Sequence, residues 1–259
     1  MISIPFFQVD AFAERPLTGN PAAVMPLDKW LPDDVLQAIA AENNLAETAF
    51  TVPAGQSDAD FDLRWFTPTV EVNLCGHATI ASGHILLTGE QVRFSTRSGI
   101  LKVVRDEDRL RLDLPAYPVE QGEEPGLLDA LGVAGPTYLN RDGNGSAILL
   151  LDSEAAVRSV TPDFAALRTI DRLVIVTAPG DEQDIASRVF AAYHGIDEDP
   201  VTGSAHAALT PFWAQRLGRT SFSALQASKR TGLLECTLAG DRVLLGGKCI
   251  TTIVGTFQL

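Results

Sequence analysis

Apolar and polar residues alternate in two stretches of the chain, and this pattern predicts strands with one buried face. Residues 61–66 and 109–114 follow a period of two, the spacing at which successive side chains of a strand point to opposite faces. Glycines at positions 99 and 240 predict hairpin-like turns. Shorter runs of strand length, rich in leucine and β-branched residues, lie at 173–176, 243–245 and 250–254.

Helical patterns are fewer than strand patterns. Residues 32–44 place Pro32 at the first helical position and apolar residues on one face, and residues 161–163 start a second helix with a good N-cap. Two further segments, 77–87 and 204–217, are apolar on most sides. We therefore expect each of these two helices to run through a core.

The sequence contains an internal repeat. Short motifs of the first half recur in the second half in the same order, at offsets between 124 and 133 residues. Any one match could arise by chance, but five in order at nearly constant spacing indicate a duplication. The pairs are 19–20 with 143–144, 31–33 with 161–163, 76–78 with 203–205, 97–103 with 230–236, and 108–112 with 241–245.

Two similar halves predict two domains. The halves meet near residues 115–126, a stretch with three prolines and two glycines that has the composition of a linker. We expect an N-terminal domain over 1–117 and a C-terminal domain over 118–247, with a final strand at about 248–259 packing back onto the first domain. Duplicated units usually pack about a pseudo-twofold axis, and the cleft between them is a favoured place for a ligand.

Composition and charge exclude several partners. The 259 residues carry 20 Lys and Arg against 33 Asp and Glu, a formal net charge of −13. This balance argues against a non-specific nucleic-acid binder and against an anionic membrane surface. No window approaches about 18 consecutive apolar residues, and the N-terminus lacks the positive charge that opens a secretory signal. We expect a cytoplasmic protein without nucleic-acid or membrane partners.

Neither a metal nor a cofactor is indicated. The three cysteines, Cys75, Cys236 and Cys249, are too widely spaced for a metal knuckle or a disulfide framework. The four histidines form no HExxH motif, and there is no glycine-rich dinucleotide or phosphate loop. We therefore expect a protein that works with no cofactor and no metal.

The N-terminal ends of two expected helices are the strongest candidates for a binding site. Residues 74–77 and 199–204 each lead through a glycine into one of the two apolar helices, at equivalent places in the repeat. A helix N-terminus presents unpaired N–H groups and the positive end of its dipole, so two such ends could bind a carboxylate or phosphate without arginine. The alternative is that Gly76 and Gly203 only permit tight strand-to-helix turns.

Titratable residues near these openings admit two interpretations. Glu47 lies among apolar residues, where a desolvated carboxylate would suit proton transfer, but an exposed strand acid fits the local pattern as well. His77 and Asp199 could be catalysts, caps or hydrogen-bonded structural residues. Asp199, Ser204 and His206 include the residue types of a hydrolytic triad, yet Ser204 and His206 are only two apart on one expected helix.

Cys75 and His77 could suggest a thiolate nucleophile. Adjacency in the sequence is not the usual geometry of a Cys–His pair, so a buried structural cysteine is the more natural role.

Long motifs along almost the entire chain resemble one known family. The chain is similar to the phenazine-biosynthesis PhzF-like isomerases, within the diaminopimelate-epimerase superfamily. These motifs are far more specific for the family than for one substrate. The matching segments are 9–12, 18–24, 44–50, 64–68, 74–79, 198–206 and 240–243.

The resemblance implies an α+β fold with two pseudo-symmetric domains, each a mixed sheet or barrel wrapped around a central helix, and an active site between them. It implies cofactor-free proton transfer on a small carboxylic acid, as in the isomerisation of a dihydro-hydroxyanthranilate, and suggests a homodimer. Glu47 takes the place of the family's general acid/base. The remaining matched positions are His77, Asp199 and Ser204 as binding and proton-relay partners, Gly76 and Gly203 as backbone anion donors, and Asn20 in the cleft.

One difference from the wider superfamily restricts the mechanism that we expect. The two-thiol epimerases use one cysteine from each half, and here Cys75 matches the first while Pro200 lies approximately where the second would be. We therefore expect a cofactor-independent isomerase acting through Glu47 rather than a two-thiol racemase. The alternative is a non-catalytic protein of the same fold that binds a metabolite or another protein, and a hydrolase comes third.

Overall fold

The chain folds into two compact units. A computed structural model describes residues 2–55, 58–140 and 145–259. The first unit comprises Met1–Asp113 and Gly246–Leu259, and the second comprises Leu114–Leu245. The sequence motif at 143–144, expected to repeat 19–20, lies outside the described residues.

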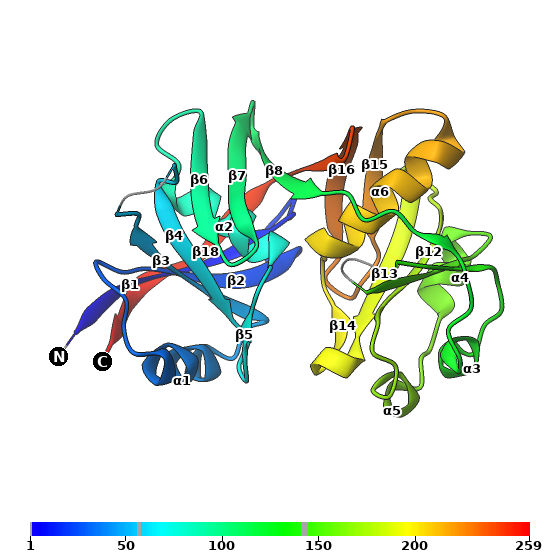
Figure 1. The fold of residues 1–259 in the computed structure, drawn as a ribbon, viewed down its shortest axis with the longest axis horizontal. Helices are drawn as coiled ribbons and strands as arrows, with labels where there is room; N and C mark the ends of the chain where they lie inside the picture. The colour runs from blue at the N-terminus through cyan, green and yellow to red at the C-terminus, as the bar shows by residue number, and fades with distance from the viewer. Residues whose placement is uncertain (1, 56–57, 141–144) are drawn as a thin grey trace. The chain divides into compact units, whose positions relative to one another are not determined.

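The first unit is a mixed sheet (Figure 1). Its final strand β18 pairs antiparallel with β1, and the pairing then continues through β2, β3, β4, β6, β7 and β8. Parallel pairing occurs between β2 and β3 and between β4 and β6. The strands are β1 (Ser3–Ala11), β2 (Asn20–Pro26), β3 (Glu47–Pro53), β4 (Phe61–Phe66), β5 (Glu71–Val72), β6 (Gln91–Thr96), β7 (Gly99–Asp106), β8 (Arg109–Pro115) and β18 (Cys249–Gln258).

Helix α2 (Gly76–Leu86) is the central helix of this unit. It contacts β1, β2, β3 and β7, and its residues 76–83 are all buried, which explains why it is apolar all round. Gly83 is required by the packing, because a Cβ there would lie 2.6 Å from Cγ1 of Val103 in β7. The second helix, α1 (Asp33–Asn43), buries only one side, through Leu36, Ile39 and Ala40.

The second unit contains a sheet with parallel pairing between β11 and β12 and between β13 and β15. Its central helix α6 (Gly203–Leu217) packs against β16, and Trp213 Nε1 donates to Thr177 Oγ1 of β12 at 3.1 Å. The other elements are β9 (Glu120–Gln121), α3 (Leu127–Leu131), β10 (Thr137–Leu139), β11 (Ser146–Leu150), α4 (Glu154–Ser159), α5 (Phe164–Leu167), β12 (Leu173–Pro179), β13 (Ile185–Ala191), η1 (Ala192–His194), β14 (Ile196–Asp199), β15 (Ser221–Gln226), β16 (Gly232–Ala239) and β17 (Arg242–Gly247).

Both units follow the same order of strand pairing. In the first unit, β2 is antiparallel to β1 and parallel to β3, while β4 is antiparallel to β3 and β5 and parallel to β6. In the second, β11, β12, β13, β14 and β15 repeat this pattern after β10. The central helix follows β5 in one unit and β14 in the other. The duplication seen in the sequence is thus a duplication of topology.

The fold is of the α+β class, as expected from the sequence. The predicted strand at 61–66 is β4, and the predicted apolar helices are α2 and α6, which begin one residue earlier, at Gly76 and Gly203. The helix predicted from residue 161 is only the short α5, with Asp163 Oδ1 accepting from the N–H groups of Ala165 and Ala166. Within the described residues, no helix is long and apolar enough to cross a membrane.

Candidate active site

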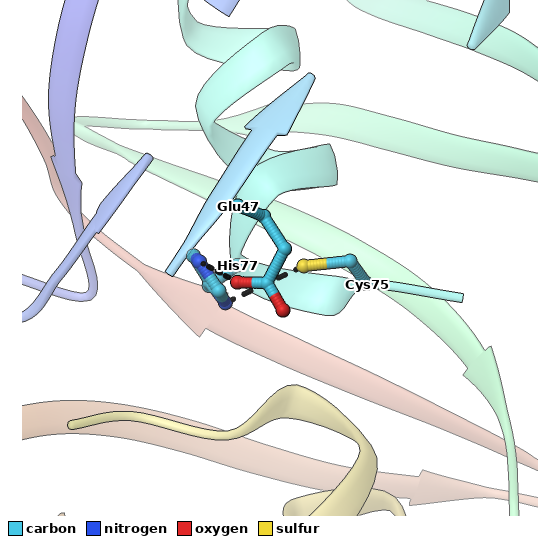
Figure 2. Close-up of side chains that lie close together, drawn as sticks. All are labelled: Glu47, Cys75 and His77. Carbon is cyan, nitrogen blue, oxygen red and sulfur yellow. Dashed lines mark hydrogen bonds and ion pairs between the residues drawn. The ribbon is translucent and has the colours of Figure 1, made fainter. Parts of the chain in front are cut away.

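Glu47 and His77 form an ion pair in the interior of the first unit. His77 Nε2 lies 3.1 Å from Glu47 Oε2, and the two side chains are only 4% and 12% exposed. Figure 2 shows both side chains converging with that of Cys75. Glu47 is therefore held by a titratable partner, unlike a strand acid in open solvent.

The fold explains why these residues meet. Glu47 is the first residue of β3, where it pairs with Ala22 of the parallel strand β2. His77 is the second residue of α2, whose N-cap position is taken by Cys75 in an extended conformation. Because α2 packs against both β2 and β3, the start of the helix and the start of the strand lie together.

The second nitrogen of the His77 ring also has two neighbours. Asn20 Nδ2 lies 3.2 Å from His77 Nδ1, and Cys75 Sγ lies 3.5 Å from the same atom. When Nδ1 carries no proton, the Asn20 amide donates to it; when it is protonated, the sulfur can accept. The ring therefore has a partner on the Nδ1 side in both charge states.

Charges around His77 favour its protonated form. Burial opposes the charge on the ring, but Cys75 and Glu47 outweigh it and hold the pKa of His77 well above its ordinary value of 6.5. Burial, together with the nearby Glu47 carboxylate, raises the pKa of the Cys75 thiol to about 11. Cys75 is consequently a thiol at neutral pH.

Glu47, Cys75 and His77 are also the residues that could hold a metal ion, because one ligand atom from each lies within 4.8 Å of the others. The geometry is poor for a single ion. Glu47 faces Nε2 of the ring while Cys75 faces Nδ1, and one ion binds only one ring nitrogen. The arrangement suits proton transfer along the ring better than metal ligation.

In the second unit, Asp199 is the last residue of β14 and begins a hydrogen-bonded turn that leads to α6. Thr202 Oγ1 donates to Asp199 Oδ2 at 2.5 Å, and Asp199 is 8% exposed. The buried amide of Gln226 braces the turn, because Nε2 donates to Asp199 O at 2.7 Å and Oε1 accepts from Thr202 N at 2.8 Å. Gly203 and Ser204 then begin α6.

The equivalent positions of the two units carry different chemistry. Leu173 is the first residue of β12 and pairs with β11 as Glu47 pairs with β2, so a buried leucine stands in the place of the acid. Thr202 precedes α6 as Cys75 precedes α2. Thr202 is therefore the residue that matches Cys75 in the structure. The superfamily pattern in the sequence had suggested Pro200, two residues earlier. Neither residue carries a thiol.

The structure thus brings three of the expected site residues, Asn20, Glu47 and His77, into one cluster of the first unit. Asp199, Gly203 and Ser204 lie together around one turn of the second unit. Gly76 is the first residue of α2.

Two sequence interpretations change. Cys75 and His77 are in contact although they are near neighbours in the sequence, because the N-cap residue turns its side chain toward the first turn of the helix. His206 does not serve as a triad base: its Nδ1–H donates to Thr202 O at 2.8 Å, and complete burial lowers its pKa to about 4. Asp199 Oδ2 accepts from Thr202 instead.

Thr202 and Gln226 are the residues that sequence reasoning did not assign. Thr202 lay inside a matched motif, so its hydroxyl was available as a signal. Gln226 ends a strand 24 residues further along the chain, and its contact with the turn follows only from the parallel pairing of β13 with β15.

Comparison with known proteins places this chain in a family. Residues 9–255 match the family described as phenazine biosynthesis-like protein. An uncharacterised isomerase of Pseudomonas aeruginosa is 49% identical over 265 residues, covering 100% of both chains. The crystal structure of a PhzF-family phenazine biosynthesis protein from Enterococcus faecalis is 45% identical, with a TM-score of 0.92 and 100% of both chains covered.

A predicted epimerase from Pseudomonas aeruginosa shares the fold at 22% identity, with a TM-score of 0.76 and 99% of both chains covered. The family resemblance found in the sequence is confirmed. With its duplicated topology and a match along almost its whole length, this chain belongs to the phenazine biosynthesis-like protein family.

Proposed function

We propose that this protein is an isomerase that moves a proton on a small carboxylic acid, with Glu47 as the general acid and base and without a cofactor. The ion pair between Glu47 and His77 is the observation that carries the proposal. A relative 49% identical over the full chain is named an isomerase, which supports the reaction class. A compound resembling a dihydro-hydroxyanthranilate is the substrate class we propose.

In the proposed reaction, His77 holds Oε2 of Glu47, and the other carboxylate oxygen takes the proton. The C–H bond of the substrate breaks, its electron pair moves into the conjugated system of the substrate, and an O–H bond forms on Glu47. Glu47 then delivers a proton to another carbon, either the one it removed or one that its carboxyl group has exchanged with solvent, which restores the carboxylate. His77, whose pKa is held well above 6.5, keeps the Glu47 carboxyl group in place through the cycle.

Backbone N–H groups would bind the substrate carboxylate. We propose Gly76 and His77 at the start of α2, and Gly203 and Ser204 at the start of α6, because the N-terminus of a helix carries the positive end of its dipole and favours an anion. Asn20 would orient His77 from the Nδ1 side. Asp199, braced by Thr202 and Gln226, would act as a proton-relay partner.

Proton exchange with solvent tests the proposal. Wild-type and Glu47→Gln proteins are incubated in D2O with a panel of small cyclic and amino carboxylates, including dihydro-hydroxyanthranilate, and carbon-bound protons are followed by NMR. We expect exchange in the wild type and a loss of about 10²- to 10⁴-fold in Glu47→Gln, the usual contribution of a general acid or base. The exposed Glu42→Gln is the matched control and should exchange like the wild type.

The outcomes separate the alternatives. Exchange that survives Glu47→Gln contradicts the mechanism. Compounds that bind equally well to both proteins, without exchange in either, favour a non-catalytic binding protein. Ester cleavage that is lost in Ser204→Ala but kept in Glu47→Gln favours a hydrolase.

A further inference from the structure

A forked ion pair lies at the base of the turn that carries Cys75 and His77. Arg64 Nε donates to Glu71 Oε1 at 2.7 Å, and Arg64 Nη2 donates to Glu71 Oε2 at 2.8 Å. The two side chains are 18% and 13% exposed, so water screens this pair less than a surface salt bridge. The guanidinium also lies 5.1 Å from the centre of the Phe66 ring, which restricts its orientation.

The pair joins β4 to β5, which adjoin the elements that bear the acid and the histidine. Arg64 belongs to β4, where it pairs with Phe50 of β3, the strand that begins at Glu47. Glu71 belongs to β5, which ends four residues before α2. Only two residue pairs connect β5 with β4, so the backbone alone holds this segment weakly. The Arg64–Glu71 ion pair adds side-chain hydrogen bonds at this short ladder.

A serine hydroxyl fixes the middle of the same turn. Ser98 Oγ, in the loop after β6, donates to Asn73 O at 2.7 Å. Asn73 lies between Glu71 and Cys75, so the turn is held at its start by the ion pair and two residues later by the serine.

Both contacts recur in the second unit. Arg188 Nε and Nη2 donate to Glu198 Oε1 and Oε2 at 2.7 and 3.0 Å, and the Arg188 guanidinium lies 5.0 Å from the Phe190 ring centre. Ser228 Oγ donates to Pro200 O at 2.8 Å. Arg188 is on β13, Glu198 on β14 and Ser228 on the loop after β15, which are the equivalents of β4, β5 and the loop after β6.

The two anchors survive although the reactive residues have diverged. The ion pair and the serine bond are the same in both units, while the acid, the N-cap residue and the second helical residue are Glu47, Cys75 and His77 in one unit and Leu173, Thr202 and Ser204 in the other. What the two turns have in common is that each presents the start of a central helix.

We propose that Arg64, Glu71 and Ser98 are positioning residues that set the distance between Glu47 and His77 by anchoring the turn before α2. The inference deepens the proposed function and rests on it for its catalytic consequence. Its structural consequence, the environment of the His77 ring, is independent of any substrate.

The test compares Glu71→Gln, Arg64→Lys and Ser98→Ala with the wild type. Each removes part of the anchor, and lysine keeps the charge of Arg64 but lacks the two-pronged guanidinium. Asp106→Asn is the matched control, because it removes a 2.8 Å ion pair with Arg111 in the β7–β8 hairpin of the same unit. Four quantities are measured: the pKa of His77 by NMR titration, kcat and KM for the exchange reaction, and the unfolding temperature.

We expect Glu71→Gln and Arg64→Lys to shift the His77 pKa toward 6.5 and to lower kcat about 10- to 100-fold with KM little changed, the effect of a small misplacement of a catalytic group. Ser98→Ala should change both quantities in the same direction by less, and Asp106→Asn should change neither.

A lower unfolding temperature in Glu71→Gln, with a wild-type His77 titration and wild-type kcat, would overturn the inference and leave the pair a structural one. If the wild type itself exchanges no substrate while the anchor variants still shift the His77 titration, the proposed function fails and the anchor stands.

Discussion

β3 begins with Glu47, and β12, which occupies the same place in the second unit, begins with Leu173. Each residue lies beside the same parallel neighbour strand, β2 in one unit and β11 in the other. Leu173 is 8% exposed and packs as an ordinary core residue, whereas Glu47 is paired with a histidine. Identical strand pairing therefore produces a charged pair in one unit and an apolar contact surface in the other.

The comparison shows which interactions the duplicated fold requires. Strand pairing uses backbone N–H and C=O groups, which every non-proline residue supplies, so the side chains at a given register are free to change. The anchors of the two strand-to-helix turns are made by side chains and are nevertheless the same in both units. In the proposed mechanism the acid therefore has one site, in the first unit, and the second unit contributes different groups.

The largest expected difference concerns the second residue of each central helix. His77→Gln removes the positive charge beside Glu47 and should lower kcat for proton exchange about 10²- to 10⁴-fold. Ser204→Ala, at the equivalent position of α6, removes one hydroxyl and should cost about tenfold or less, the value of a single hydrogen bond. The measurement is the rate of proton exchange in each variant. Equal losses of kcat in the two variants would contradict the functional asymmetry of the two units.

A smaller effect, on stability rather than on activity, is expected at the first residue of β12. Leu173→Ala removes a buried side chain and should lower the free energy of unfolding by about 2–3 kcal/mol, measured by denaturant titration. The exchange rate per folded molecule should stay close to the wild-type value. A loss of exchange as large as that of Glu47→Gln would mean that Leu173 contributes to the chemistry.

The smallest expected effect is that of metal removal. Because different nitrogens of His77 face Glu47 and Cys75, we expect the purified protein to hold no stoichiometric metal at this cluster and EDTA to leave the exchange rate unchanged. Elemental analysis of the protein before and after chelation provides the measurement. Loss of activity with EDTA and its recovery with one specific divalent ion would contradict metal-free proton transfer and favour a metal-dependent reaction.

Local sequence signals were sufficient to predict the helices that carry or flank the site. Glycine at the opening of each apolar helix, repeated at an offset of 127 residues, predicted the starts of α2 and α6 to within one residue. The proline-opened helix at 32–44 is α1, which begins at Asp33. These features depend on caps, turns and periodicity, all of which are encoded within a few neighbouring residues.

Contacts between distant segments could not be predicted in the same way. Glu47 and His77 are 30 residues apart, and their local sequences did not distinguish a buried ion pair from an exposed acid and a capping histidine. The bracing of Asp199 by Gln226 depends on the parallel pairing of β13 with β15, which no pattern in either strand specifies. Turn lengths also differ between the halves, so the offset between equivalent residues changes from 124 at Arg64 and Arg188 to 127 at Glu71 and Glu198.

Titration of His77 tests the central claim, that Glu47 and His77 form a coupled acid–base pair, most directly. In protein labelled with ¹⁵N-histidine, NMR should give a pKa of His77 well above 6.5 in the wild type and a clearly lower value in Glu47→Gln. Because the pKa is raised by folding, the pair stabilises the protein fully below pH 6.5, and this contribution is lost as the pH rises through the raised pKa. A His77 pKa at or below 6.5 in the wild type, unchanged by Glu47→Gln, would contradict the account.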